Sequence, residues 1–199
     1  MIWSALAWLA SRPVVFGWLL RRAVKTPYSH ITSADGADTY MRRWWLFNPY
    51  ATERGARADG GESDARPLWR RMLPSVRIHH IMRPDQDRHL HTHPWNARTI
   101  ILDGWYSEER YGDPDMPPST DSLRWPGPFY DAPPRDEYRR ARGYTGPLRH
   151  GEFHRITAVS HGGVWTLFIT GRKRGSWGFD VDGVKVPWRE YLAQHEESE

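Results

Sequence analysis

Histidine is concentrated in one short stretch of this chain, and its spacing there suits metal binding. His89, His91 and His93 alternate with other residues in the run HLHTHPW. In an extended strand alternate side chains point to the same face, so His91 and His93 would share a face, about 7 Å apart along the chain. Two imidazoles so placed can bind one metal ion if another strand brings a third ligand. We predict that His154, in the segment HGEFH, is that ligand.

The remaining residue types narrow the chemistry. There is no cysteine, which excludes disulfides, thiolate metal sites and a cysteine nucleophile. It also agrees with a reducing compartment, and we expect a cytoplasmic protein. Three further residues could support a metal site: His89 as a residue at its mouth or behind its ligands, Asp87 as a partner that orients a ligand imidazole, and Glu152 as an alternative carboxylate ligand.

Charge and motif content exclude several function classes. The formal net charge is +4, and the basic residues occur mostly as scattered pairs, which is typical of a solvated surface and does not favour nucleic-acid binding. No glycine-rich phosphate loop and no Gly-x-Ser-x-Gly nucleophile elbow is present. Nucleotide-dependent phosphoryl transfer and serine hydrolase chemistry are therefore disfavoured.

The amino-terminal segment from Ile2 to Leu20 is strongly apolar but is interrupted at Arg12. A transmembrane helix needs about 20 uninterrupted apolar residues, and a signal peptide needs positive charge before its apolar run. We predict two short helices instead, with Ser11 as the N-cap and Pro13 in the first turn of the second. This helical arm, residues 1–30, would pack on the domain or on a partner, and we expect no membrane attachment.

Residues 31–199 contain a series of short β-type runs separated by turn signals. Asp103-Gly104 and Asp182-Gly183 each lie between two such runs and predict hairpins. Predicted strands cover residues 39–47, 75–82, 99–102, 105–108, 153–159, 164–170, 177–181 and 184–186, with Val76, Ile78 and His80 on one face of the second.

Two segments lack periodicity and are expected to be loops, residues 50–66 and residues 112–148, the second being a candidate lid. A helix from Pro187 to Leu192 closes the chain. Many short strands without alternating helices indicate one mainly β domain, an antiparallel barrel or sandwich.

The histidine motifs resemble those of the cupin superfamily. The pair His91-Thr92-His93 resembles the His-x-His of its first motif, Gly104 falls near that motif's glycine, and Gly151-Glu152-Phe153-His154 resembles the Gly-x-x-His of its second. The resemblance covers roughly residues 75–181 and implies an antiparallel jelly-roll barrel. The run DRHLHTHPW, with HRI, WTLFITG and WGF downstream, is similar to a group of small cupin-like proteins from bacteria and their phages.

One departure from the cupin pattern is informative. The motif's glutamate would fall at Ala97 or Arg98, and neither side chain can bind a metal. The resemblance therefore implies a site of three histidines without a carboxylate, similar to cysteine-dioxygenase-like cupins, in which three imidazoles hold ferrous iron. Arg98, if it lines the barrel, would pair with a substrate carboxylate or phosphate, and Tyr106 is a candidate for acid–base chemistry.

These inferences favour a divalent metal at His91, His93 and His154, with Fe(II) expected and Zn, Mn or Ni as alternatives. The leading function is metal-dependent oxidation of a small polar or anionic substrate by a dioxygenase-type enzyme. Two alternatives remain open: a non-redox enzyme such as a sugar or nucleotide isomerase or epimerase, and a non-catalytic metal-binding or assembly module. We expect a small-molecule substrate and consider a homodimer.

Overall fold

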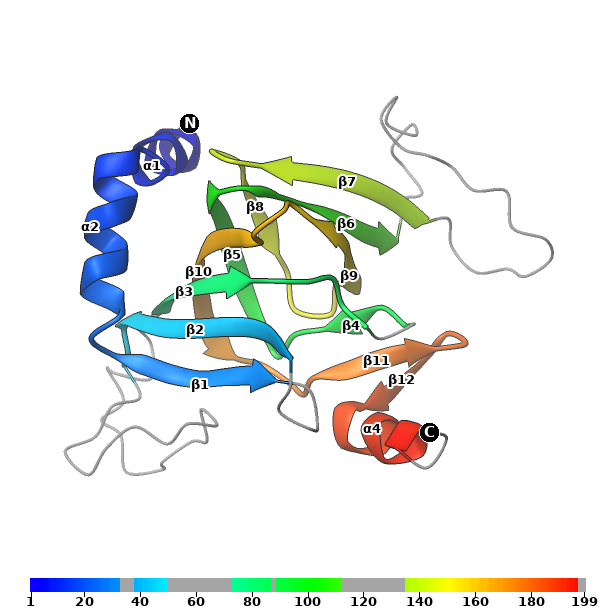
Figure 1. Cartoon of the computed structure of the whole chain (residues 1–199). Helices are drawn as coiled ribbons and strands as arrows, with labels where there is room; N and C mark the ends of the chain where they lie inside the picture. The colour runs from blue at the N-terminus through cyan, green and yellow to red at the C-terminus, as the bar shows by residue number, and fades with distance from the viewer. Residues whose placement is uncertain (33–37, 50–72, 87–88, 112–134, 197–199) are drawn as a thin grey trace.

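The computed structural model describes residues 1–32, 38–49, 73–86, 89–111 and 135–196. Within them, two antiparallel six-stranded sheets lie with two helices at the amino end and one at the carboxyl end (Figure 1). The predicted mainly β architecture, with an amino-terminal helical arm and a short carboxyl-terminal helix, is confirmed. The first sheet contains, in spatial order, β1 (Pro27–Thr32), β2 (Thr39–Phe47), β3 (Ser75–Ile81), β10 (Val164–Lys173), β5 (Trp95–Asp103) and β8 (Thr145–Leu148). The second contains β12 (Val184–Pro187), β11 (Gly178–Val181), β4 (His91–Thr92), β9 (His154–Val159), β6 (Trp105–Tyr111) and β7 (Arg135–Ala141).

Eight strands form a nested set of antiparallel pairs: β3 with β10, β4 with β9, β5 with β8, and β6 with β7. The chain from β3 to β10 is therefore one long folded hairpin, whose successive pairs fall alternately into the first and second sheets. This is the strand arrangement of a jelly roll. Because no hydrogen-bonded strand pair joins the two sheets among the described residues, the jelly roll is a sandwich, one of the two forms that the sequence predicted.

Both faces of β3, an inner strand of the first sheet, are largely buried. Ile78 belongs to the outer core cluster, which includes Ala7 and Ala23 of the helical arm. His80 stacks on Trp165, at the same cluster, with ring centroids 4.0 Å apart. The inner face instead presents Arg77, His79 and Ile81 to a cavity between the sheets. The predicted shared face of Ile78 and His80 is thus the outer one.

The helical arm consists of α1 (Ile2–Ala10) and α2 (Pro13–Ala23), as predicted. The predicted N-cap is wrong, because Arg12 occupies that position with an extended backbone (φ −68°, ψ 135°). Pro13 is the first helical residue and disfavours helical geometry at the residue before it. Ser11 instead ends α1, where its hydroxyl donates to the Trp8 carbonyl. Among the described residues no single helix is long and apolar enough to cross a membrane; α1 and α2 meet that test only as a pair bent by 79°.

The two Asp-Gly turns have different outcomes. Asp182-Gly183 makes the predicted hairpin between β11 and β12, with both residues at positive φ. The hairpin predicted at Asp103-Gly104 is wrong, because β5 and β6 lie in different sheets and the turn carries the chain from one to the other. Gly104 has φ +77°, and a Cβ there would lie 2.7 Å from the Gly163 carbonyl oxygen, so the crossover needs glycine.

The long loop predicted at residues 112–148 is partly wrong. Its second part forms β7 and β8, whereas residues 112–134, and with them the proposed lid, lie outside the described residues. The loop predicted at residues 50–66 also lies outside them. At the carboxyl end Pro187 closes β12, and α4 (Trp188–Glu196) follows, with Tyr191 stacked on Phe179 at 3.9 Å.

Candidate metal centre

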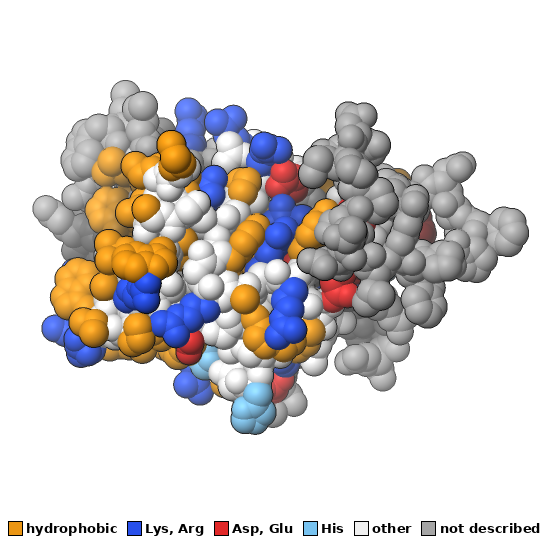
Figure 2. All heavy atoms as spheres, turned by 90° about the horizontal axis from the view of Figure 1, so that it is seen from above, with side chains coloured by type: hydrophobic (Ala, Val, Ile, Leu, Met, Phe, Trp, Pro, Cys, Tyr) orange, Lys and Arg blue, Asp and Glu red, His pale blue; other side chains and the backbone are white. Residues whose placement is uncertain are grey.

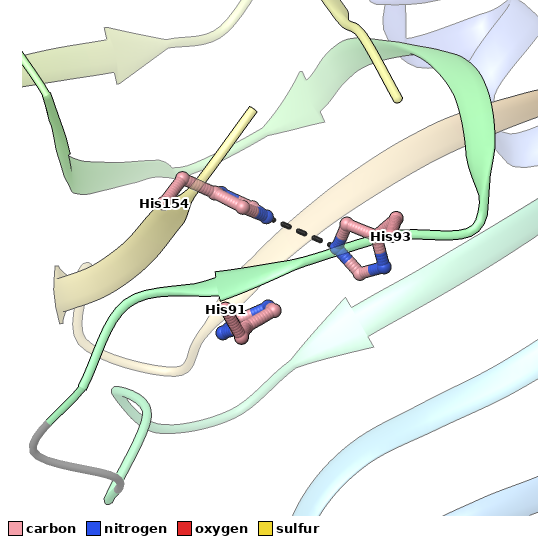
Figure 3. A group of neighbouring side chains, drawn as sticks. All are labelled: His91, His93 and His154. Atoms are coloured by element: carbon pink, nitrogen blue, oxygen red, sulfur yellow. Dashed lines mark hydrogen bonds between the residues drawn. The ribbon is translucent and has the colours of Figure 1, made fainter. Parts of the chain in front are cut away.

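The three predicted ligand histidines lie together at one end of the inter-sheet cavity (Figure 3). His91 in β4 is the register partner of His154 at the start of β9, and His93 follows two residues after His91. Each offers one ring nitrogen, and these three atoms lie within 4.8 Å of one another. The Nε2 atoms of His93 and His154 are 3.0 Å apart. The structure therefore brings together the three histidines that the sequence spacing indicated, although β4 ends at Thr92 and His93 lies just beyond it.

The geometry of this group fits a metal ion. Imidazole nitrogens bound at about 2.0–2.1 Å to one ion lie roughly 3.0–3.4 Å from each other. His93 and His154 already have this separation, and the ligand atom of His91 lies within 4.8 Å of theirs. The Nδ1 atom of His91 is buried and has no hydrogen-bond partner among the described residues. Three neutral imidazoles that converge in this way suit a divalent first-row ion.

A carboxylate that the sequence analysis missed stands behind His154. The Nδ1 atom of His154 donates to the Oε1 atom of Glu108 at 2.8 Å, which leaves the Nε2 lone pair directed at the other two histidines. Glu108 is 2 % exposed and also accepts from Arg110 (2.9 Å) and Arg140 (3.4 Å). Burial acts to raise the pKa of Glu108, but the His154 hydrogen bond and the nearby charges outweigh it and lower the pKa to about 2.

His91 has an acidic neighbour of its own, Asp85. Its Nδ1 atom lies 3.9 Å from the Oδ2 atom of Asp85, too far for a hydrogen bond. Asp85 is itself held by Tyr40 and by the amide of Ile156. Asp85 thus stands beside a candidate ligand histidine, whereas Asp87, the predicted partner, lies outside the described residues.

Burial keeps His91 and His93, two of the three candidate ligands, neutral at neutral pH. It lowers the pKa of His91 to about 4, with a further lowering from His154 and opposing effects from Asp85 and Glu108. Burial, then the neighbouring histidines, also lowers the pKa of His93 well below its usual value. Neutral imidazole is the form that binds metal, so these ligands need not release a proton to water before they bind.

The cavity has a volume of about 220 Å³ and extends from the histidines toward the first sheet. Most of its wall is apolar or aromatic, including Trp95, Phe168 and Trp177. Tyr106, a predicted acid–base residue, also lines it. Burial, and next the charge of Glu108, raises the pKa of Tyr106 well above its ordinary value, so its phenol stays protonated.

A cluster of two arginines and one histidine from the first sheet lines the same cavity. Arg43 in β2 is the register partner of His79 in β3, and Arg77 lies two residues before His79 on the same face. Arg77 is 5 % exposed, and its guanidinium lies 4.4 Å from the Trp45 ring centroid. The Nε2 atom of His79 is buried, and the described part of the chain offers it no hydrogen-bond partner. The alternation of side chains along β3 could have indicated that Arg77 and His79 share a face. The prediction considered only the opposite face of this strand.

Three other predicted residues do not reach the cavity. The Arg98 guanidinium lies 4.6 Å from the Trp3 ring centroid, on the outer face of the sheet against α1. His89 contacts the Tyr191 hydroxyl at 3.0 Å, and Glu152 accepts from the amide of Arg149. None of the three lines the cavity or belongs to the three-histidine group.

No protein-family model matches the sequence, and a search of curated proteins finds no relative. Among solved structures, oxalate decarboxylase from Lactobacillus farciminis in complex with formate matches with a TM-score of 0.44 and 12 % identity, over 88 % of this chain and 36 % of that one. Vicilin from hazelnut (Corylus avellana) matches with a TM-score of 0.44 and 13 % identity, over 85 % and 38 %. The enzyme HppE with Fe(II) matches with a TM-score of 0.40 and 12 % identity, over 71 % and 55 %.

The chain thus spans about a third to a half of the length of these proteins. These matches include an oxalate decarboxylase and a vicilin, and their similarity to this chain is too low to transfer an activity. The nested strand pairs and the histidine geometry define the class independently of them: a jelly-roll protein with a candidate three-histidine metal centre in a largely apolar cavity.

Proposed function

We propose that this protein is a metal-dependent member of the cupin superfamily that oxidises a small polar or anionic substrate, in the manner of non-haem iron oxygenases. The observation that carries the proposal is the convergence of His91, His93 and His154 at the cavity between the two sheets. Glu108 adds to it, because a carboxylate that orients a ligand imidazole is a recurrent feature of metal sites.

The three histidines would hold the ion, and Fe(II) bound there would supply open positions for O₂ and a substrate donor atom. Because all three ligands are neutral, the site keeps the full charge of the ion for anionic partners. Glu108 does not change this, since its charge is offset by Arg110 and Arg140. The apolar wall excludes water from the reacting groups.

The cluster of Arg43, Arg77 and His79 supports an anionic substrate through the positive charges of its two arginines, whereas burial keeps His79 neutral. Its side chains come from the first sheet, whereas His91 and His154 come from the second, so one substrate can contact both ends of the cavity. Tyr106 keeps its proton and therefore serves as a hydrogen-bond donor rather than a base. The substrate that fits best is a small organic anion with an apolar body.

Elemental analysis tests the proposal. Untagged protein purified without chelator should contain about one iron per chain, and His91→Ala and His154→Ala should each contain below about 0.1. His161→Ala is the matched control, because His161 is exposed and lies outside the cavity. Full metal content in both site variants would contradict the site.

The identity of the metal separates the remaining alternatives. Iron, together with oxygen uptake in screens of small thiols and acids, would support the oxygenase. Zinc or manganese in a protein indifferent to oxygen would instead support a non-redox isomerase or epimerase. A chain that neither contains nor takes up metal would point to a binding or assembly module.

A further inference from the structure

The helical arm carries more apolar surface than the sandwich can bury. One side of it packs on the first sheet through Ala7 and Ala23, with Phe16 against Trp165 at 5.7 Å. The other side is open, and Figure 2 shows hydrophobic side chains gathered at the end of the molecule where α1 and α2 lie. Nine of the thirteen exposed large hydrophobic side chains of the described residues belong to this arm surface: Met1, Ile2, Trp3, Leu6, Trp8, Leu9, Val14, Trp18 and Val24.

A helix that is apolar all round is normally buried in a core or in a membrane. The arm surface is buried in neither way by its own domain: Val14 is 82 %, Trp18 59 % and Trp8 58 % exposed. Contiguous exposed apolar patches on this scale mark interaction sites. The arm surface therefore requires a partner, and its charges indicate which.

All charged side chains of the helical arm, and of the residues that follow it up to position 34, are basic. Arg12, Arg21, Arg22 and Lys25 are the charged residues of the first 34 positions, and the first acidic residue is Asp35. The Arg12 guanidinium lies 3.7 Å from the Trp8 ring centroid, so a positive charge borders an exposed indole. A second copy of this chain would bring like charges together, whereas a surface of anionic lipid headgroups would complement them.

The residue types also suit the boundary between lipid and water. Tryptophan is enriched at that boundary, because its ring is apolar and its N–H seeks a polar partner. Trp3, Trp8 and Trp18 are all exposed on the arm surface. Amphipathic segments that lie in this boundary combine such aromatic residues with lysine and arginine.

The geometry indicates that the arm lies along a bilayer rather than across it. The helices have 9 and 11 residues, about half of what a spanning helix needs, and they meet at 79°. Both are also fixed to the sandwich, since the Arg142 Nε atom donates to the Ser11 carbonyl at 2.9 Å where the two helices join.

We propose that α1 and α2 form a docking surface for an anionic lipid bilayer, with the exposed tryptophans in the headgroup region and the basic side chains on the lipid phosphates. This reverses the expectation of no membrane attachment. It is independent of the proposed function, because the arm covers the outer face of the first sheet and the cavity lies on its inner face.

Vesicle co-sedimentation of the full-length protein tests the proposal. Vesicles of phosphatidylcholine with about 30 mol % phosphatidylglycerol should bind it, and pure phosphatidylcholine should bind it at least about tenfold more weakly. Raising the salt from about 0.05 M to 0.5 M should weaken binding to the anionic vesicles. Val14→Ser should weaken it about threefold, and Trp8→Ser with Trp18→Ser about tenfold or more.

Val184→Ser is the matched control, because Val184 is 64 % exposed on β12, away from the arm. It should bind vesicles as the unmodified chain does, and all variants should keep the unmodified unfolding midpoint. Equal loss in Val14→Ser and Val184→Ser would overturn the proposal, as would equal binding to both vesicle types. Absence of vesicle binding, with a dimer in sedimentation that Trp8→Ser and Trp18→Ser dissociate, would show that a second copy covers the arm.

Discussion

The Nδ1 atom of His154 donates a hydrogen bond to Glu108 at 2.8 Å, although the two residues are 46 positions apart in the sequence. The strand pairing of β6 with β9 brings them together. Because Glu108 is ionised, the contact fixes the His154 tautomer and leaves Nε2 to face His93. Three histidines alone would be a common cluster; three histidines with one oriented by a buried carboxylate resemble a prepared ligand set.

Replacing this carboxylate should weaken the metal site while its ligands remain. We expect Glu108→Gln to lower metal affinity about 10- to 100-fold, because the amide orients the imidazole without its charge. Competition with a fluorescent chelator measures the change. Glu109→Gln is the control, since Glu109 pairs with Arg135 and Arg155 rather than with a histidine. Equal affinity in both variants would remove Glu108 from the site.

Two arginines are candidates for binding the anionic group of a substrate. The sequence suggested Arg98, whereas the structure places Arg77 in the cavity and Arg98 over Trp3. We expect Arg77→Met to weaken benzoate binding to the metal-loaded protein about tenfold or more, and Arg98→Met to leave it unchanged. Calorimetric titration with benzoate, and with benzamide as its uncharged counterpart, measures both. The reverse order of effects would restore Arg98 as the anchor.

Acid should destabilise the metal-free protein. The pKa of His91 is about 4 when folded and about 6.5 when unfolded, so between these values the unfolded chain binds a proton that the folded chain does not. Its contribution, about 3 kcal/mol, is present above pH 6.5 and is lost as the pH falls to about 4. His79 and His93 act in the same direction, because burial lowers their pKa values too. Urea unfolding in a chelator should show a shallower pH dependence in His91→Gln; equal slopes would contradict the assignment.

The crossover at Gly104 should tolerate no side chain. Gly104 and Gly162 have similar φ values, +77° and +80°, but only at Gly104 would a Cβ meet the Ser160 hydroxyl (2.5 Å) and the Gly163 carbonyl (2.7 Å). Gly162→Ala should therefore cost about 1 kcal/mol of unfolding free energy and Gly104→Ala about 3 kcal/mol. Chemical denaturation gives both values. Equal losses would mean that conformation alone, and not crowding, selects glycine at residue 104.

Local pattern predicted most strands and all three histidines of the candidate site, because alternation and turn residues are short-range signals. It failed where the answer depends on pairing between distant strands. Asp103-Gly104 has the same turn chemistry whether the next strand returns to its own sheet or crosses to the other. Arg98 and Thr99 are neighbours on β5, and only the sheet's position decides that Thr99 lines the cavity and Arg98 does not.

The carboxylate was missed for a related reason. It was sought at the motif spacing, near Arg98, and not on the strand that pairs with His154. For Asp85, likewise, nothing in the local sequence indicates that its carboxylate accepts a hydrogen bond from the Ile156 amide. Tertiary packing decides which carboxylates lie behind the ligand histidines. The ligand histidines themselves can be predicted from their spacing in the sequence.

The nested strand pairs have a kinetic consequence. Closing a loop costs more entropy as its ends lie further apart in the chain, so the inner pair β6–β7 should form before β4–β9 and β3–β10. His91 and His154 belong to β4–β9, the third pair counted outward from β6–β7. We expect metal binding to appear late in refolding, after most of the sandwich has formed. A partly folded chain would contain the three histidines but would not yet bind the ion.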